Sequence, residues 1–210
     1  MDRLDGRVAI VTGSSSGIGE AVARRLADLG ANVVVNSSSS VEAGTAAAES
    51  LPTDALYVRA DISDQAQGHD LIARTIDRFG RLDILVNKAG WTTRVPHEDL
   101  DLLTDDIFRR TFEVNVFGTW WLTKAALPHL LTALLAKACG PVRVNAVAPG
   151  LVATPWTSQW EDQHASIAAA APLHRSATPD DCAEAVIGLL RSSYITGQVV
   201  VVDGGTTLVI

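Results

Sequence analysis

Cysteine is scarce in this sequence, and its two copies stand far apart. Cys139 and Cys182 form no C-x-x-C pair, and neither joins a cluster of histidines with metal-ligand spacing. A disulfide framework is excluded by this number, so we interpret both cysteines as small apolar core residues, as is usual in the reducing cytoplasm. The sequence therefore predicts a cytoplasmic protein without a metal site.

Long apolar runs and an excess of positive charge are also missing. No run approaches the roughly 18 apolar residues of a transmembrane helix, and the segment Met1–Gly6 is too polar for the core of a signal peptide. The formal net charge is −7, with the charges interspersed, whereas nucleic-acid-binding proteins usually have a basic face. We therefore expect a soluble protein that binds neither a membrane nor nucleic acid.

The composition that is present is that of an ordinary globular protein. Hydrophobic residues make up 47% of the 210 residues and charged residues 20%, and the chain shows no internal repeat, low-complexity tract or linker. This length suits one large α/β domain with a substantial core. We therefore expect residues 1–210 to form a single domain.

Short β-branched runs alternate with segments of helical period along the whole chain. The runs predict strands over residues 8–11, 33–35, 55–58, 82–86, 142–147 and 199–202. The first run, Val8–Val11, is continuously apolar, which is typical of a parallel strand covered by helices on both faces. Helix starts are predicted by a capping box over Ser39–Glu42, by Asp64, by Thr104, and by Thr178 followed by proline and two acids. This order predicts an α/β fold with a doubly wound parallel sheet, the Rossmann fold.

A glycine-rich turn joins the first predicted strand to the first predicted helix. Thr12–Gly19 has the spacing G-x-x-x-G-x-G, which differs from the G-x-G-x-x-G fingerprint and lacks the lysine of a P-loop. Glycines there would let a pyrophosphate approach the helix N-terminus, where free N–H groups and the helix dipole favour negative charge. A chance turn is the alternative, but the flanking strand and helix favour a dinucleotide site.

Further motifs follow this turn in an order that resembles the classical short-chain dehydrogenase/reductase family. Thr12–Gly19 resembles the family's cofactor signature, Asn87–Gly90 resembles its Asn-Asn-Ala-Gly, and Arg143–Gly150 resembles the strand and turn that lead to the nicotinamide. Tyr194–Gln198 and Val201–Gly205 resemble its C-terminal signature. The resemblance covers nearly the whole chain. It implies an NAD(P)-dependent oxidoreductase that interconverts a ketone and a secondary alcohol of a small-molecule substrate by hydride transfer.

The resemblance also implies roles for individual residues. Asp61 matches the acid that holds the adenine amino group, Asn115 matches the catalytic-site asparagine, and Thr154 falls where the family binds the nicotinamide carboxamide. The cofactor-binding residues that it implies are Gly13, Ser15, Ser16, Gly17, Ile18, Gly19, Asp61, Ile62, Asn87, Ala89, Gly90, Pro149, Gly150, Val152 and Thr154. Asn115 is the one catalytic residue that it assigns.

The family's catalytic tyrosine and lysine are missing. In the family a tyrosine acts as the general acid, a lysine four residues later on the same helix face lowers its pKa, and a serine holds the substrate carbonyl. This chain has no Tyr-x-x-x-Lys: its only tyrosines are Tyr57, in the third strand, and Tyr194, in the C-terminal signature. Lys124 belongs to the helix after Asn115, and Lys137 lies too late in the chain.

The missing residues would lie at one junction. Residues 125–130 resemble the end of the family's fourth helix and residues 131–137 the later half of its fifth, so roughly three dozen residues are absent between Leu130 and Leu131. They would hold the fifth strand, the serine, the tyrosine and the lysine. A sequence that skips a segment is one interpretation, and a truncated, catalytically inactive dinucleotide-binding protein is the other. The first predicts an interruption, with the Cα atoms of Leu130 and Leu131 further apart than the about 3.8 Å that a peptide bond allows.

The end of the second strand bears on the choice of cofactor. Asn36–Ser39 contains neither the aspartate that binds the ribose hydroxyls in NAD-preferring relatives nor the arginine usual near this point in NADP-preferring ones. The absence of a repelling acid favours NADP, with NAD as the alternative. Lys88 stands where the family has a second asparagine, which leaves the support of that turn open.

Two apolar segments complete the predictions. Leu151–Ala171 falls where the family has its mobile substrate lid, and Trp156 and Trp160 there either cover an apolar substrate or are ordinary packing residues. The run Phe112–Leu135 carries more apolar side chains than one sheet face needs, Trp120 among them, and the family buries these helices against a partner. We therefore expect a homo-oligomer, specifically a homotetramer.

Overall fold

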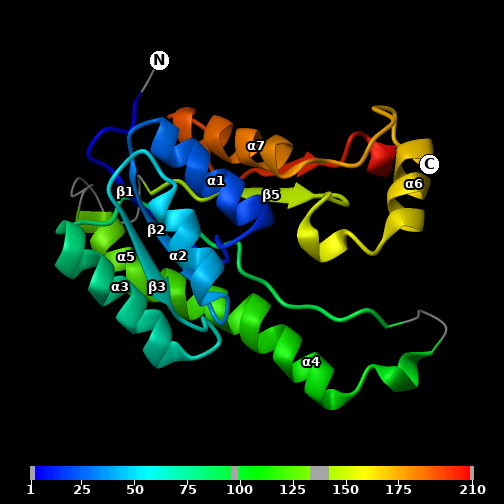
Figure 1. Ribbon diagram of the computed structural model, residues 1–210, viewed down its shortest axis with the longest axis horizontal. Helices are drawn as coiled ribbons and strands as arrows, with labels where there is room; N and C mark the ends of the chain where they lie inside the picture. Colours follow the sequence, from blue (N-terminus) through cyan, green and yellow to red (C-terminus); the bar gives the residue numbers. More distant parts are fainter. Residues whose placement is uncertain (1–2, 96–98, 133–141, 209–210) are drawn as a thin grey trace.

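The computed structural model describes residues 3–95, 99–132 and 142–208, which form two parallel sheets flanked by helices (Figure 1). The first sheet, in the order β3-β2-β1-β4, consists of β1 (Val8–Val11), β2 (Asn32–Ser37), β3 (Ala55–Arg59) and β4 (Ile84–Val86). The second pairs β5 (Ala146–Pro149) with β6 (Val199–Val202). The helices are α1 (Gly17–Asp28), α2 (Val41–Glu49), α3 (Gln65–Phe79), α4 (Asp105–Phe112), α5 (Thr119–Thr132), α6 (Glu161–Ala170) and α7 (Pro179–Arg191), with a π-helical turn η2 (Glu113–Gly118) between α4 and α5 and 3-10 turns η1 (Leu100–Leu102), η3 (Pro155–Thr157) and η4 (Thr206–Leu208).

The first sheet is buried by helices on both faces, as its apolar strands predict. All four residues of β1 are at most 1% exposed, because Ala9 and Val11 face one apolar cluster and Ile10 faces another. The first cluster includes Leu26 of α1 together with residues of α2 and α7, and the second includes Leu71 of α3 together with residues of α5. The doubly wound parallel fold expected from the sequence is therefore confirmed.

Three of the four predicted helix starts are confirmed. Asp64 caps α3 through two backbone N–H groups, Thr104 caps α4, and Thr178 opens α7 with a reciprocal capping box. The capping box predicted over Ser39–Glu42 is wrong, since α2 has Ser40 at its N-cap position without a side-chain hydrogen bond. The Ser40 backbone (φ −82°, ψ 68°) is not in the extended conformation from which an N-cap side chain usually reaches the helix.

Two strands begin later than the sequence predicts, because polar side chains occupy the backbone groups before them. The strand expected over 82–86 begins at residue 84, since the Asp83 carboxylate accepts a hydrogen bond from the Val8 N–H of β1 (2.9 Å). The strand expected over 142–147 is β5 and lies at residues 146–149. Before it, the Val144 N–H donates to the Thr196 hydroxyl (3.2 Å).

The parallel sheet is divided between β4 and β5. In the described part of the chain β4 pairs with β1 alone and β5 with β6 alone, so each has one edge without a neighbouring strand. The apolar residues there are poorly covered: all of β4 is half-buried, and Val199 and Val201 of β6 are 65% and 53% exposed. The second sheet is held by α7, which packs along α1 (Figure 1) and forms ion pairs from Asp180 and Glu184 to Arg25.

The helix that follows α4 is continuous across the junction of Leu130 and Leu131. The long helix predicted from Thr104 is confirmed, as α4, the turn η2 and α5, and α5 extends to Thr132. The predicted interruption is therefore wrong: both leucines are helical. Leu130 and Leu131 are good helix formers, and Pro128, two residues earlier in α5, has no N–H to donate to the helix backbone.

The cysteine that the structure describes has the surroundings of a core residue. Cys182 is buried in α7, and desolvation raises the pKa of its thiol to about 11, as for a core residue. Cys139 and Lys137 lie outside the described residues. Within the described ranges no helix combines the length and the apolar character needed to cross a bilayer.

Candidate active site

The glycine turn after β1 adopts a conformation that only glycine accommodates. Gly13 (φ +62°) and Gly17 (φ +59°) are in the left-handed region. A Cβ on Gly13 would lie 2.9 Å from the Ala89 Cα, and one on Gly19 would meet the carbonyl of Gly13 and lie 2.8 Å from the Ser14 Cα. Side chains at Gly13 and Gly19 would therefore collide with neighbouring backbone, and the sharp turn requires glycine at both positions, as in turns that bring backbone N–H groups to a phosphate.

Buried hydroxyl and amide groups tie this turn to the ends of β2 and β3. The Ser14 hydroxyl donates to the Val11 carbonyl (2.6 Å) and accepts from the Asn36 N–H (3.0 Å). The Asn36 carboxamide in turn donates to the carbonyls of Val58 (3.1 Å) and Ala60 (3.0 Å). The turn is consequently braced by two neighbouring strands.

Thr12 ties the same turn to the end of β4. Its buried hydroxyl accepts hydrogen bonds from the N–H groups of Lys88 (2.9 Å) and Ala89 (3.0 Å). The turn after β4 is therefore supported by backbone groups, whatever side chain stands at position 88. Desolvation lowers the pKa of the Lys88 ammonium. Asn87 reaches the other way and donates to the Thr123 hydroxyl of α5 (3.0 Å).

The N-terminus of α1 lies at the open side of the glycine turn. Ser16 takes the N-cap position in an extended conformation and makes no capping hydrogen bond, and Ser15 and Ile18 flank it half-buried. A Cβ on Gly17 would lie 3.3 Å from the methyl carbon of Thr154, so the segment after β5 stands beside this turn. Backbone N–H groups at a helix N-terminus suit a pyrophosphate.

Asp61 lies at the end of β3 and is engaged by neighbouring groups. One carboxylate oxygen accepts from the Ser63 N–H (3.0 Å) and hydroxyl (2.7 Å), and the other pairs with Arg110 of α4 (2.9 Å). Partial burial raises the pKa of the Asp61 carboxyl, but the hydrogen bonds from Ser63 and Arg110 outweigh it and hold the pKa below its usual range. The backbone at Ile62 is approached closely by η2, since a Cβ on Gly118 would lie 2.7 Å from the Ile62 carbonyl oxygen.

Asn115 lies in the π-helical turn η2 and holds the segment after β4. Its carboxamide accepts from the Trp91 N–H (2.8 Å) and donates to the Trp91 carbonyl (2.9 Å). A Cβ on Gly90 would lie 3.4 Å from the Asn115 side-chain oxygen. π-Helical turns in α-helices are frequent at functional sites. The Asn115 side chain thus acts on the backbone that borders the site.

The segment after β5 is anchored before it reaches the two tryptophans. The Gly150 N–H donates to the Val202 carbonyl (3.0 Å), and a Cβ on Gly150 would lie 2.8 Å from the Asp203 Cβ. Thr157 is buried and its hydroxyl donates to the Val152 carbonyl (2.7 Å). Pro149, Gly150, Val152 and Thr154 therefore form a fixed edge of the site.

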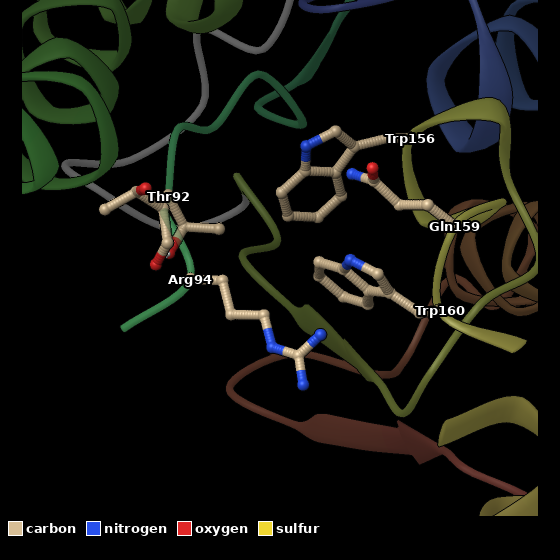
Figure 2. Close-up of a pocket in the computed structure, with 6 residues that line it drawn as sticks. Thr92, Arg94, Trp156, Gln159 and Trp160 are labelled. Atoms are coloured by element: carbon tan, nitrogen blue, oxygen red, sulfur yellow. Dashed lines mark hydrogen bonds between the residues drawn. The ribbon is translucent and has the colours of Figure 1, made fainter. Parts of the chain in front are cut away.

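A cavity of about 390 Å³ opens between this segment and the residues after β4 (Figure 2). It is lined by Thr92, Thr93, Arg94, Trp156, Gln159 and Trp160. Figure 2 shows both indole rings projecting toward the loop segment that carries Thr92 and Arg94. The ring centroids are 5.2 Å apart at an interplanar angle of 56°.

Sequence reasoning missed an arginine at the end of β3. Arg59 stands opposite Ser37 in the register of β3 and β2, and its Nε donates to the Ser38 carbonyl (3.1 Å). It therefore brings a positive charge to the place where no arginine was found in the sequence of β2. Ser37 is buried, and its hydroxyl shares a hydrogen bond with the Tyr57 hydroxyl (2.8 Å). The signal was available only through the pairing of the two strands.

The predicted site residues gather at the carboxyl ends of the strands. Neither tyrosine joins them as a general acid beside a lysine. Tyr57 bonds Ser37, and Tyr194 is fully exposed in the loop before β6. Neither is hydrogen-bonded to a lysine in the described part of the chain, where Lys124 is exposed on α5. The described residues also contain no group of three or more histidine, cysteine or acidic side chains arranged to bind a metal ion.

Comparison with known proteins gives this geometry a family. Residues 7–138 match the model of the short chain dehydrogenases, and residues 129–207 match that of the enoyl-(acyl carrier protein) reductases. The chain is 47% identical over 247 positions to the granaticin polyketide synthase putative ketoacyl reductase 2 of Streptomyces violaceoruber, covering 99% of this chain and 98% of the relative. It is 32% identical to an L-fucose dehydrogenase of Oryctolagus cuniculus, over 98% of this chain and 87% of the relative.

Solved structures agree in fold. A short-chain dehydrogenase/reductase of Brucella melitensis, titled a glucose/ribitol dehydrogenase, superposes with a TM-score of 0.86 at 26% identity, over 96% of this chain and 97% of the other. A putative short-chain dehydrogenase/reductase of Burkholderia xenovorans gives a TM-score of 0.85 at 28% identity, over 96% and 98%. The chain belongs to the short-chain dehydrogenase/reductase family of oxidoreductases.

Proposed function

We propose that this protein binds NADP and takes part in hydride transfer between the cofactor and a small ketone or secondary alcohol. The observation that carries the proposal is the glycine turn. A Cβ at Gly13 or Gly19 would collide with neighbouring backbone, and the buried hydroxyls of Thr12 and Ser14 brace the turn by accepting hydrogen bonds from the end of β2 and from the residues after β4. When bound, the nicotinamide cofactor supplies or accepts the hydride, while the protein supplies binding and orientation.

The residues around the turn have distinct tasks in this proposal. The first N–H groups of α1, from Gly17 to Gly19, hold the pyrophosphate, with Ser15, Ser16 and Ile18 around it. The Asp61 carboxylate and the Ile62 backbone hold the adenine, and Thr154 holds the carboxamide of the nicotinamide. Asn87, Ala89, Gly90, Pro149, Gly150 and Val152 form the walls between them. Asn115 positions one wall by fixing the Trp91 backbone at two points.

We propose a preference for NADP on the position of Arg59. In related folds the adenosine ribose lies at the end of the second strand, where an acid favours NAD and an arginine favours the 2′-phosphate. The exposed guanidinium of Arg59 lies against the Ser38 backbone at this point. Arginine pairs well with phosphate because its planar donors match the phosphate oxygens. A cation from β3 thus takes the place of one from β2.

We propose further that hydride transfer needs a segment that relatives have and this chain lacks. The alignment with the granaticin relative runs over 247 positions, whereas this chain has 210 residues, so at least 37 positions hold a residue of the relative alone. The match passes from one family model to the other within residues 129–138. The unpaired edges of β4 and β5 leave a place for one more parallel strand. The segment between Leu130 and Leu131 would supply that strand with the serine, tyrosine and lysine.

A catalytically inactive dinucleotide-binding protein is the second candidate. The continuity of α5 across Leu130 and Leu131 favours it, together with the lack of a Tyr-x-x-x-Lys in the chain. In this candidate the cofactor site is kept and the acid is lost. Both candidates predict cofactor binding, and they differ in what the gene encodes at the junction and in what restoring the segment does.

An insertion experiment separates the two candidates. The residues that the granaticin relative has at this junction are inserted between Leu130 and Leu131, and NADPH oxidation with 1-tetralone as the ketone is followed by absorbance. We expect the 210-residue chain to bind NADPH without oxidising it and the chimera to oxidise it, with loss of turnover when the inserted tyrosine becomes phenylalanine. A chimera that binds NADPH but stays inactive, with encoding DNA that contains no such segment, would favour the binding protein.

We also propose a cytoplasmic homotetramer that acts on a small carbonyl substrate. Four apolar side chains along η2 and its flanking helices are between 41% and 59% exposed, and grouped exposed apolar residues often mark a protein–protein interface: Phe112, Val116, Phe117 and Trp120. A second copy of the chain would cover it through a symmetric contact. The buried thiol of Cys182 is compatible with a reducing compartment.

A further inference from the structure

We propose that the cavity of Figure 2 selects a substrate with a flat, fused-ring body and an anionic group at one end. This inference rests on the proposed function, since it names the substrate class of the same site. It is carried by three features of the cavity: two indole walls, a lone cation at the rim, and a rigid base under the tryptophans.

The walls are aromatic and remain available to a ligand. The rings of Trp156 and Trp160 are tilted by 56° with centroids 5.2 Å apart, so they do not cover each other face to face. Trp156 is 58% exposed, and neither ring belongs to the two apolar core clusters. Large aromatic rings are costly to leave in water, and their faces favour offset contact with another flat ring system. The two rings therefore offer a stacking surface to a planar apolar body.

The tryptophans project from a base that is held in place. Thr157 between them is buried and bonded to the Val152 carbonyl (2.7 Å), and the Thr157 hydroxyl also accepts from the Thr154 N–H (3.0 Å). His164 of α6 joins the Ser176 hydroxyl (2.7 Å) to the Thr157 carbonyl (3.2 Å). Ligand binding would therefore cost little conformational entropy, because the rings are already held in position.

The cation is Arg94, on the opposite wall. In the orientation of the Gln163 amide that satisfies both groups, the Gln163 oxygen accepts from Nη2 (2.7 Å) and Nη1 (3.3 Å) of Arg94. This partner is neutral, and no acidic side chain is among the residues that line the cavity. Because this partner carries no negative charge, the positive charge of the guanidinium is free to pair with a carboxylate or a similar anion of the ligand. The hydroxyls of Thr92 and Thr93 add donors on the same wall.

The position of the cavity sets the orientation of the substrate. Thr92 follows Trp91, whose backbone Asn115 holds, so one end of the cavity adjoins the site where the cofactor is proposed to bind. The reacting carbonyl would lie toward Trp91 and the anionic group toward Arg94. A volume of about 390 Å³ has room for a body of two or three rings, within the usual range of small-molecule sites.

Three probes test the inference by calorimetry on the chain saturated with NADPH: 2-naphthoate, which is flat and anionic; 2-naphthamide, which is flat and neutral; and hexanoate, which is anionic and not flat. We expect 2-naphthoate to bind about tenfold more tightly than either of the others, as for one charge-assisted contact and one aromatic surface. Arg94→Gln should remove the tenfold advantage over 2-naphthamide, whereas Arg191→Gln, an exposed arginine on α7, should keep it. Trp160→Leu should weaken both flat probes, and Trp160→Phe should restore most of the loss.

The outcomes separate this inference from the proposed function. Equal binding of 2-naphthoate and 2-naphthamide, or an Arg94→Gln variant that behaves like Arg191→Gln, overturns the inference while NADPH binding stands. Tight binding of hexanoate without 2-naphthoate overturns it as well. Loss of NADPH binding in the unaltered chain instead refutes the proposed function. Circular dichroism of each variant shows whether the variant is folded. If Trp160→Leu does not fold, the conservative Trp160→Phe variant is used in its place.

Discussion

Replacing Arg59 with glutamine is expected to weaken the binding of NADPH and to leave the binding of NADH almost unchanged. The two cofactors differ by the 2′-phosphate, and Arg59 is the cation that strand pairing places opposite Ser37. Glutamine keeps a polar side chain of similar length and can still bond the Ser38 carbonyl. The substitution therefore removes the charge and little else.

The size of the effect follows from the exposure of Arg59. Two unit charges about 4 Å apart attract by about 4 kcal/mol at an effective dielectric constant of about 20, which is an upper bound for a group near the surface. Arg59 is exposed, so water and salt reduce this value to that of a charge-assisted hydrogen bond, about 1.4–2 kcal/mol. This corresponds to a tenfold to thirtyfold loss of NADPH affinity.

Calorimetric titration of both cofactors into both proteins measures this loss directly, at two salt concentrations. Arg74→Gln, which changes an exposed arginine on α3, is the matched control and should bind both cofactors as the unaltered chain does. The difference for NADPH should shrink at high salt because the interaction is electrostatic. If Arg59→Gln weakened NADH and NADPH equally, Arg59 would be a structural residue. If it weakened neither, the 2′-phosphate would lie elsewhere.

Three further predictions concern the turn, the fold and the assembly. Gly13→Val should abolish NADPH binding in calorimetry while circular dichroism retains the helices, because a Cβ there would lie 2.9 Å from the Ala89 Cα; an unchanged affinity would contradict the proposed site. Asp83→Asn should lower the free energy of unfolding at pH 7 by about 2 kcal/mol, since the buried carboxylate accepts from the Val8 N–H and pairs with two arginines. Burial raises the pKa of the Asp83 carboxyl, but these partners hold it below the unfolded value of about 3.9. The stabilisation is therefore complete above that pH and is lost as the pH falls through the folded pKa. Urea unfolding curves of the two proteins should converge in acid, and a stability difference that stays constant with pH would refute the assignment. Trp120→Asp should convert a tetramer into smaller species in light scattering at micromolar concentration, and a monomeric unaltered chain would exclude the proposed interface.

Much of the fold was predictable because its signals are local. A continuous apolar run such as Val8–Val11 indicates a strand buried on both faces, and a threonine before proline and two acids, as at Thr178, indicates a helix start. The glycine turn is of the same kind, since positive φ angles at Gly13 and Gly17 are a property of single residues in their own backbone. Local sequence therefore determined the α/β class, the order of the elements and the glycine turn after β1.

Where local signals competed with polar side chains, the sequence prediction failed. The start of β5 depends on Thr196, whose hydroxyl accepts from the Val144 N–H before the strand. The expected capping box before α2 depends on a backbone conformation that Ser40 does not adopt. The periodicity of the sequence predicts neither the bounds of β5 nor the cap of α2, because both are decided by groups that the rest of the fold brings near.

The pairs that shape the site were decided only by the tertiary structure. Arg59 faces Ser37 because β3 pairs with β2 in one register, and Asn115 reaches the Trp91 backbone because η2 packs beside the end of β4. The Asp61–Arg110 pair likewise joins residues 49 positions apart. Such contacts require strands and helices to be fixed relative to one another by burial of the two apolar clusters. The division of the sheet between β4 and β5 has the same origin. Strand pairing depends on which strands are neighbours in space, and the sequence of a single strand does not specify its neighbours.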